Sequence, residues 1–341
     1  MLVPAFALPY AAVALAYGAL TDRVGRRRVV GVCIGGLSLA LGGGAAAPGL
    51  GSLVALRVVA GLSGGGVMPA ALAHVADLYA YEERGRALGV VFAALTAGLA
   101  AGVSLGPILA AAAGWRYVFA GLAALNAALV CLLRVESAGG DEGSRTATSL
   151  AAALRGYWTV LAEGRARRTY LVMVLAGLCI FGSSTWFGVY VHARFGLGGR
   201  GIGLAYLAYG LVGCMSPWTG AAADRYGRAR LVPAGLGAVA LGALLLAAQG
   251  SLPQAIVGLA WVALGHQLTY PLLAGLASEI VPAARGCAMG LNSFALFVGV
   301  ACGSAAVGAL LPMGFRVAYG AVALVAVATV PAASHSLRGE R

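Results

Sequence analysis

Long apolar runs separated by short polar segments make up almost the whole chain. Each run has about 20 residues, the length that an α-helix needs to cross the hydrocarbon core of a bilayer. The runs do not alternate with a period of two, so they do not indicate the strands of a barrel. The pattern predicts eleven membrane-spanning helices, at 3–20, 29–47, 51–77, 87–112, 115–133, 169–191, 201–221, 231–249, 253–279, 286–311 and 315–333.

One polar and charged segment interrupts this pattern near the middle of the chain. It begins with the flexible stretch ESAGGDEGSRTATS and continues with apolar residues at helical spacing, after a possible N-cap at Ser149. We expect a helix on the membrane surface that bridges two membrane halves; a plain linker is the alternative. The expected organisation is an N-terminal half at 1–134, a cytoplasmic linker with an amphipathic helix at 135–168, and a C-terminal half at 169–335.

Composition agrees with an all-α polytopic membrane protein. Only 10% of the 341 residues are charged, against roughly 25% in a soluble domain. All 23 basic residues are arginine, which excludes a Walker A phosphate loop and a Schiff-base lysine and points to a prokaryote with a GC-rich genome. The six cysteines form no C-x-x-C pair, and we expect neither a metal site nor a cofactor.

The arginines also predict the orientation of the chain. If the loop at 18–28 lies in the cytoplasm and the spans alternate, eighteen arginines fall on the cytoplasmic side and four on the opposite side. Cytoplasmic loops of membrane proteins carry such an excess. The net charge of +12 therefore has an explanation without nucleic acid, which we do not expect as a partner.

A short basic loop occurs twice, about half the chain apart. GALTDRVGRRR at 18–28 and GAAADRYGRAR at 220–230 share seven of eleven positions. The stretches at 114–116 and 82–89 also recur, 200 and 201 residues later. Three matches at nearly one offset indicate an internal duplication, which is common in transporters.

The duplication leaves the two halves unequal, with five spans in the first and six in the second. The span at 169–191 precedes the second loop, and its counterpart in the first half would fall before Met1. We therefore expect that one N-terminal helix is absent from this chain; a natural protein of eleven spans is the alternative.

These motifs resemble the major facilitator superfamily. GALTDRVGRRR resembles its cytoplasmic signature loop, and the motifs that follow agree in order with its fourth, fifth and sixth helices. The resemblance implies the major facilitator fold in two pseudo-symmetric halves, lacking the first helix, and favours the drug–proton antiporter branch. It covers almost the whole chain.

The resemblance assigns the signature loops a role as a conformational latch. Asp22 would face the positive end of the helix that starts near 285–286, and Asp224 would face the helix that starts near 84–85. Such contacts exist only while the cytoplasmic side is closed, so they favour one access state; a plain topology signal is the alternative. The expected latch residues are Gly18, Asp22, Arg23, Gly25, Arg26, Gly220, Asp224, Arg225, Gly227 and Arg228. Their arginines are expected to pair with Asp77, Glu82, Glu83 or Glu279.

The fifth family helix is represented by the segment GVSLGP, which resembles the antiporter motif G-x-x-x-G-P. Gly98, Gly102 and Gly106 form a smooth face and Pro107 bends the helix. The family implies a seal against proton leak; close helix packing is the alternative. The motif is incomplete, since Ala93 stands where the family has glycine.

Polar side chains inside the spans are the remaining candidates. Arg57 lies about six residues inside its span and is interpreted as a structural or proton-relay arginine, or as one that extends to the outer interface. Polar and aromatic residues in the second half suggest a neutral, aromatic substrate cavity; interfacial belts and interhelical hydrogen bonds are the alternative. The cavity candidates are Trp186, Tyr190, His266, Gln267, Tyr270 and Asn292.

Together these features predict a secondary active transporter that works by alternating access and is not an enzyme. We expect proton-coupled efflux of a small drug-like or metabolite substrate by a monomer in the cell membrane, with the lipid bilayer, the substrate and protons as partners. An uptake carrier for a small organic solute and a non-transporting truncated remnant are the alternatives. No acidic residue lies at the middle of a predicted span, so His266 is a candidate for the coupling group.

Overall fold

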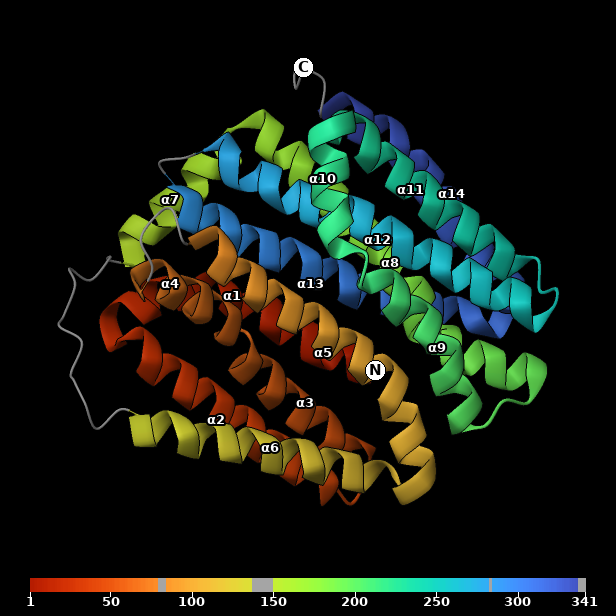
Figure 1. The fold of residues 1–341 in the computed structure, drawn as a ribbon, viewed down its shortest axis with the longest axis horizontal. Helices are drawn as coiled ribbons and strands as arrows, with labels where there is room; N and C mark the ends of the chain where they lie inside the picture. The colour runs from red at the N-terminus through yellow and green to blue at the C-terminus, as the bar shows by residue number, and fades with distance from the viewer. Residues whose placement is uncertain (79–83, 137–149, 282–283, 337–341) are drawn as a thin grey trace.

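The computed structural model describes residues 1–78, 84–136, 150–281 and 284–336 (Figure 1). The first half contains α1 (Leu2–Val24), α2 (Arg26–Ala45), α3 (Leu50–Gly64), α4 (Val67–Leu78), α5 (Arg84–Ala113) and α6 (Trp115–Glu136). The second half contains α8 (Gly164–Phe195), α9 (Gly199–Gly213), α10 (Ser216–Tyr226), α11 (Arg228–Ala247), α12 (Leu252–Ile280), α13 (Arg285–Leu310) and α14 (Phe315–Ser336), and α7 (Leu150–Ala162) precedes it.

The predicted all-α membrane fold is confirmed. In the described part of the chain, nine helical stretches are long and apolar enough to cross a membrane, and Leu2–Tyr17 is a shorter apolar helix. The expected span at 201–221 is divided between α9 and α10 and is not among the nine. The count of eleven spans therefore stays a prediction.

Pairs of glycines make the same turns in both halves. Gly25 precedes α2 with a φ of +94°, and Gly227 precedes α11 with a φ of +81°. Gly114 and Gly314 precede α6 and α14 with φ values of +97° and +102°. Side chains with a Cβ rarely adopt such angles, which explains why glycine recurs at these places in the repeat.

The break between α9 and α10 is stabilised by a side chain from a neighbouring helix. Gln267 on α12 donates a hydrogen bond from Nε2 to the backbone oxygen of Gly213, at 2.7 Å. A backbone carbonyl at a break lacks its helical partner, and leaving it unpaired away from water is costly. This buried glutamine therefore has a structural role at the end of α9.

The largest core lies in the second half, where α8 packs between α12, α13 and α14. In the first half, α2 packs against α6 and α3, and α3 also contacts α1. The two halves meet along two helix pairs, α1 with α13 and α5 with α9. In Figure 1, α1, α5 and α13 lie near the centre of the molecule.

The helix α7 lies across the ends of helices from both halves (Figure 1). Its Val160 is buried in the core of the second half. Its Tyr157 donates a hydrogen bond from the hydroxyl to the backbone oxygen of Leu15 in α1, at 2.6 Å. Burial, together with the nearby Cys287, raises the pKa of Tyr157 to about 12. The helix α7 thus lies within the segment expected as the linker and contacts both halves; the expected division of the chain at 134 and 169 stays a prediction.

Candidate functional site

The first contact between the halves is formed by aromatic and small apolar side chains. Tyr10 of α1 stacks on Phe297 of α13 with ring centroids 3.7 Å apart. Ala7, one turn earlier in α1, is completely buried against Val300 and Ala301. These side chains close the α1–α13 seam of the interface.

The second contact is a close approach of two backbones. A Cβ on Gly199 of α9 would lie 2.6 Å from the backbone oxygen of Pro107 in α5. A Cβ on Gly203 would collide with the backbone oxygen of Ser104, and one on Gly210 would lie 3.1 Å from the Cβ of Ala100. Small residues allow helices in a membrane to pack this closely.

A cavity of about 330 Å³ opens beside the second contact, between α5, α8 and α9. Its volume lies in the range of small-molecule sites. None of the residues recorded in its wall carries a formal charge, and its polar groups are hydroxyls. The wall consists of Leu99, Gly102, Val103, Pro107, Phe181, Ser184, Thr185, Tyr206 and Tyr209.

The hydroxyl of Tyr206 is fixed by two backbone groups of α8. It donates to the oxygen of Ser184 at 2.6 Å and accepts from the N–H of Gly188 at 3.2 Å. Both of its hydrogen-bonding roles therefore have partners within the protein.

Tyr209 connects the cavity to His266. Its hydroxyl oxygen lies 2.9 Å from Nδ1 of that imidazole. Phe181, another residue of the wall, contacts the same imidazole edge to face, with ring centroids 5.4 Å apart. His266 therefore lies directly behind two aromatic residues of the cavity wall.

The six cavity candidates from the sequence are placed elsewhere than in this wall. Trp186 donates from Nε1 to the oxygen of Ser304 at 2.8 Å, and Tyr190 is buried in an aromatic cluster with Phe187, Phe195, Phe315 and Tyr319. Asn292 donates to the hydroxyl of Tyr270 at 3.0 Å, and the ring of Tyr270 contacts His266. Gln267 binds the end of α9, as described above. None of the six lines this wall, and most of these side chains make contacts between helices; only His266 reaches the cavity, through Tyr209 and Phe181. A role of the six in substrate binding stays a prediction.

The glycine face of α5 does not show the close helix packing that was the alternative to a proton seal. Gly98, Gly102 and Gly106 have no atom within 4 Å of a Cβ built on them, so no described helix packs closely there. The residues of α5 that contact α9 lie on another face, at Ala100, Ser104 and Pro107. Gly102 and Pro107 instead line the cavity. The expected role as a seal against proton leak stays a prediction.

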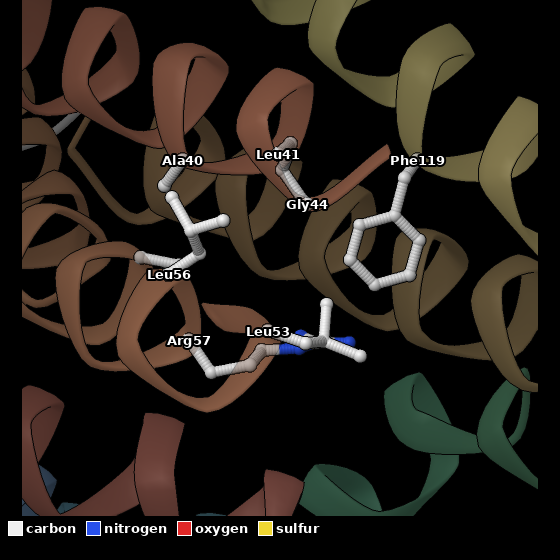
Figure 2. Close-up of a pocket in the computed structure, with 8 residues that line it drawn as sticks. Ala40, Leu41, Gly44, Leu53, Leu56, Arg57 and Phe119 are labelled. Carbon is white, nitrogen blue, oxygen red and sulfur yellow. The ribbon is translucent and has the colours of Figure 1, made fainter. Parts of the chain in front are cut away.

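Arg57 is directed into its own half rather than into the cavity. Its guanidinium lies 4.9 Å from the ring centroid of Phe119 in α6, within the range of a cation–π contact. Figure 2 shows it beside Leu53 and below Leu56, among tightly packed apolar residues. Its Nε is buried and finds no hydrogen-bond partner in the described part of the chain. This placement favours a structural role between α3 and α6.

In the described part of the second copy of the expected latch, an ion pair is formed. Arg228 at the start of α11 binds both carboxylate oxygens of Glu279 at the end of α12, at 2.7 and 2.9 Å. Both residues belong to the second half, so this pair joins neighbouring helices rather than the two halves. Arg225 lies over the ring of Tyr226. The side chains of Asp22, Arg23, Arg26 and Asp224 lie outside the described residues.

Gly102 and Pro107 of the wall were expected in the antiporter motif, and Ser184, Tyr206 and Tyr209 belong to the polar and aromatic residues of the second half, but none of them was among the six cavity candidates. Phe181 and Ser184 are three residues apart, as are Tyr206 and Tyr209, so each pair shares one helix face. Two such pairs on consecutive predicted helices were the available signal. Leu99 and Val103 carry no signal, because leucine and valine are common on every face of a membrane helix.

Known proteins are similar to this chain over most of its length. The family model described as Major Facilitator Superfamily matches residues 1–216 and 201–338. The chain is 28% identical over 282 residues to the uncharacterized MFS-type transporter YwfA of Bacillus subtilis (strain 168), covering 80% of the chain and 66% of the relative. It is 30% identical over 238 residues to the class C tetracycline resistance protein of Escherichia coli, covering 67% of the chain and 59% of the relative. The chain thus spans less than two thirds of the length of these relatives.

Solved structures share the fold. The human organic anion transporter MFSD10 (TETRAN) superposes with a TM-score of 0.72 at 22% identity, over 97% of this chain and 82% of that one. A POT family transporter in complex with 5-aminolevulinic acid superposes with a TM-score of 0.77 at 15% identity, over 96% and 85% of the two chains.

Proposed function

Because this chain belongs to the Major Facilitator Superfamily, we propose that it is a secondary active transporter that works by alternating access. The observation that carries the proposal is the cavity of about 330 Å³ between the halves, beside the α5–α9 contact. A ligand there touches α5 from one half and α8 and α9 from the other, so movement of the halves changes its surroundings. Such differential contact is what a ligand needs in order to shift a conformational equilibrium.

We propose that the protein exports a small, weakly charged or apolar molecule. The wall has aromatic rings, hydroxyls and no formal charge, which suits ligands that gain more from apolar burial than from ion pairing. The similarity to a tetracycline resistance protein supports export. We propose that the protein acts as a monomer in the cell membrane.

Proton coupling is proposed to use His266. Histidine is the side chain whose charge ordinarily changes near neutral pH. His266 lies one side chain away from the cavity, behind Tyr209 and Phe181. A proton bound there can respond to whether the cavity is filled.

The test is transport by the purified chain in vesicles with an imposed pH gradient. We expect accumulation of tetracycline that requires the gradient and is abolished when the gradient is collapsed. Gly102→Trp fills the cavity from an open position and is expected to reduce the rate at least tenfold. Gly98→Trp, one turn away and also in open space, is the matched control because Gly98 does not line the cavity. Equal rates for both variants, or accumulation independent of pH, would contradict the proposal.

A further inference from the structure

We propose that Tyr209 reports the protonation state of His266 to the cavity by reversing the direction of its hydrogen bond, and that the exported substrate therefore presents a hydrogen-bond donor to Tyr209. This inference rests on the proposed function, in which His266 exchanges a proton. It adds a residue that couples proton and substrate, and a chemical requirement on the substrate.

Tyr209 belongs both to the cavity wall and to the immediate surroundings of His266. Its ring is part of the cavity wall, and its hydroxyl lies 2.9 Å from Nδ1 of His266. A tyrosine hydroxyl has one proton to donate and lone pairs that accept, while each imidazole nitrogen either donates or accepts according to its proton. The direction of this hydrogen bond therefore depends on whether Nδ1 carries a proton.

In the neutral state with the ring proton on Nε2, Nδ1 is an acceptor. The hydroxyl of Tyr209 then donates to His266, and its remaining lone pair is available to the cavity. In this state the cavity accepts a hydrogen bond from a ligand that carries an N–H or O–H group.

In the protonated state Nδ1 carries a hydrogen and donates to the oxygen of Tyr209. The hydroxyl proton of Tyr209 has to turn away from the imidazole, so the cavity now presents a donor. A donor ligand meets a donor and loses its hydrogen bond, whereas a ligand with a carbonyl or ether oxygen gains one. Donor ligands and protons therefore exclude each other, which is the linkage that exchange requires.

Tyr206 provides an internal comparison in the same wall. Its hydroxyl already donates to the oxygen of Ser184 and accepts from the N–H of Gly188. Because both partners are backbone groups that do not titrate, its hydrogen bonds keep one direction at any pH. Of the two tyrosines in the wall, only Tyr209 is able to change its polarity with the proton on His266.

The other described ionisable groups around His266 do not replace the imidazole as the group that changes charge. Tyr270, on α12 itself, contacts His266 ring to ring, at 5.9 Å between centroids, and its hydroxyl accepts from Asn292. Phe181 from α8 contributes no titratable group. The charged residues of α12 and of the helices packed against it are near helix ends, whereas His266 is at the middle of α12. Those whose side chains the structure describes are Arg165, Arg167, Arg168, Arg194, Arg200, Arg225, Arg228, Arg230 and Glu279, together with His192. The remaining titratable residues described on these helices are cysteines and tyrosines.

The experiment compares three small aromatic probes on the purified full chain by calorimetry at pH 4 and pH 8. N-methylbenzylamine is charged and carries N–H donors, benzyltrimethylammonium is charged without a donor, and acetophenone is a neutral acceptor. Charge repulsion from a protonated imidazole affects both cations alike, so the ratio of their affinities isolates the hydrogen bond. We expect this ratio to favour the donor probe about twofold more at pH 8 than at pH 4, and acetophenone to bind better at pH 4.

Three variants distinguish the role of Tyr209 in coupling from proton binding at His266. Tyr209→Phe is expected to remove the pH dependence of the ratio, while Tyr206→Phe keeps it; far-ultraviolet circular dichroism of each variant checks the fold. A ratio that still changes with pH in Tyr209→Phe overturns the role of Tyr209 but leaves proton exchange at His266 intact. If the affinity of every probe is independent of pH and unchanged in His266→Gln, the proton role in the proposed function fails as well. If none of the probes binds, the cavity is not the ligand site and both proposals are overturned.

Discussion

The central helices of the two halves, α5 and α13, carry the same glycines in different surroundings. Gly98 and Gly102 recur 201 residues later as Gly299 and Gly303. In α13, a Cβ on Gly299 would lie 2.6 Å from the backbone oxygen of Val174, and one on Gly303 would collide with the backbone of Leu178. In α5, a Cβ on either glycine meets nothing within 4 Å.

The difference is explained by what covers each helix. α8 packs along α13, whereas no helix in the described part of the chain takes that place against α5. In an apolar stretch of 18 residues, 33% are buried within the span Gly286–Met313 but 6% within the span Ala94–Ala113. A duplicated glycine pair thus serves backbone packing in one half, and in the other Gly102 borders a cavity. The additional helix expected for the first half stays a prediction.

The largest effect on stability is expected when valine replaces Gly303 of α13, in contrast to the equivalent Gly102 of α5. Gly303→Val should destabilise the protein by about 3 kcal/mol or more, because the Cβ meets the α8 backbone, which cannot rotate away. Gly102→Val should change the midpoint of thermal unfolding in detergent little, because its Cβ enters open space. Similar losses for both variants would show that α5 is packed as closely as α13.

A smaller contrast is expected one turn away. Gly299→Ala should cost about 1–3 kcal/mol, since its Cβ would come within 2.6 Å of a carbonyl oxygen. Gly98→Ala should be neutral or stabilising by up to about 1 kcal/mol, because alanine is the better helix former. The check is again thermal unfolding, measured for both variants in the same detergent.

A weaker link between the halves is testable through pH. Tyr157→Phe removes the hydrogen bond from α7 to α1 and should cost about 1 kcal/mol. The folded-state pKa of Tyr157 is raised to about 12, above the value of about 10 in the unfolded chain. Its contribution is therefore complete below pH 10 and is lost as the pH rises toward 12. Unfolding temperatures of the variant should fall less steeply over that range than those of the parent protein.

The smallest effect is expected within the second half. Arg228→Ala breaks the pair with Glu279, whose side chains are 31% and 56% exposed. Solvent-exposed ion pairs contribute about 0–1 kcal/mol and weaken in salt. The loss should therefore shrink at 0.5 M salt, and a large loss that persists in salt would indicate a function beyond joining α11 to α12.

The sequence by itself determined the helical membrane fold, the family, the duplication and the paired turns. These follow from local physics: apolar length sets a membrane span, and Gly25, Gly114, Gly227 and Gly314 adopt positive φ angles that other residues rarely tolerate. Such features depend on a few neighbouring residues and survive without knowledge of the rest of the chain.

Only the tertiary structure decided which polar and small residues face a cavity. Trp186, Gln267 and Asn292 look like cavity residues in the sequence, yet each makes a hydrogen bond to a neighbouring helix. Gly102 and Gly303 are equivalent in the sequence and differ only in whether α8 lies against them. In a membrane every apolar face is acceptable to lipid, so hydropathy cannot distinguish a face that meets lipid, a helix or a ligand. The packing of distant segments makes that choice.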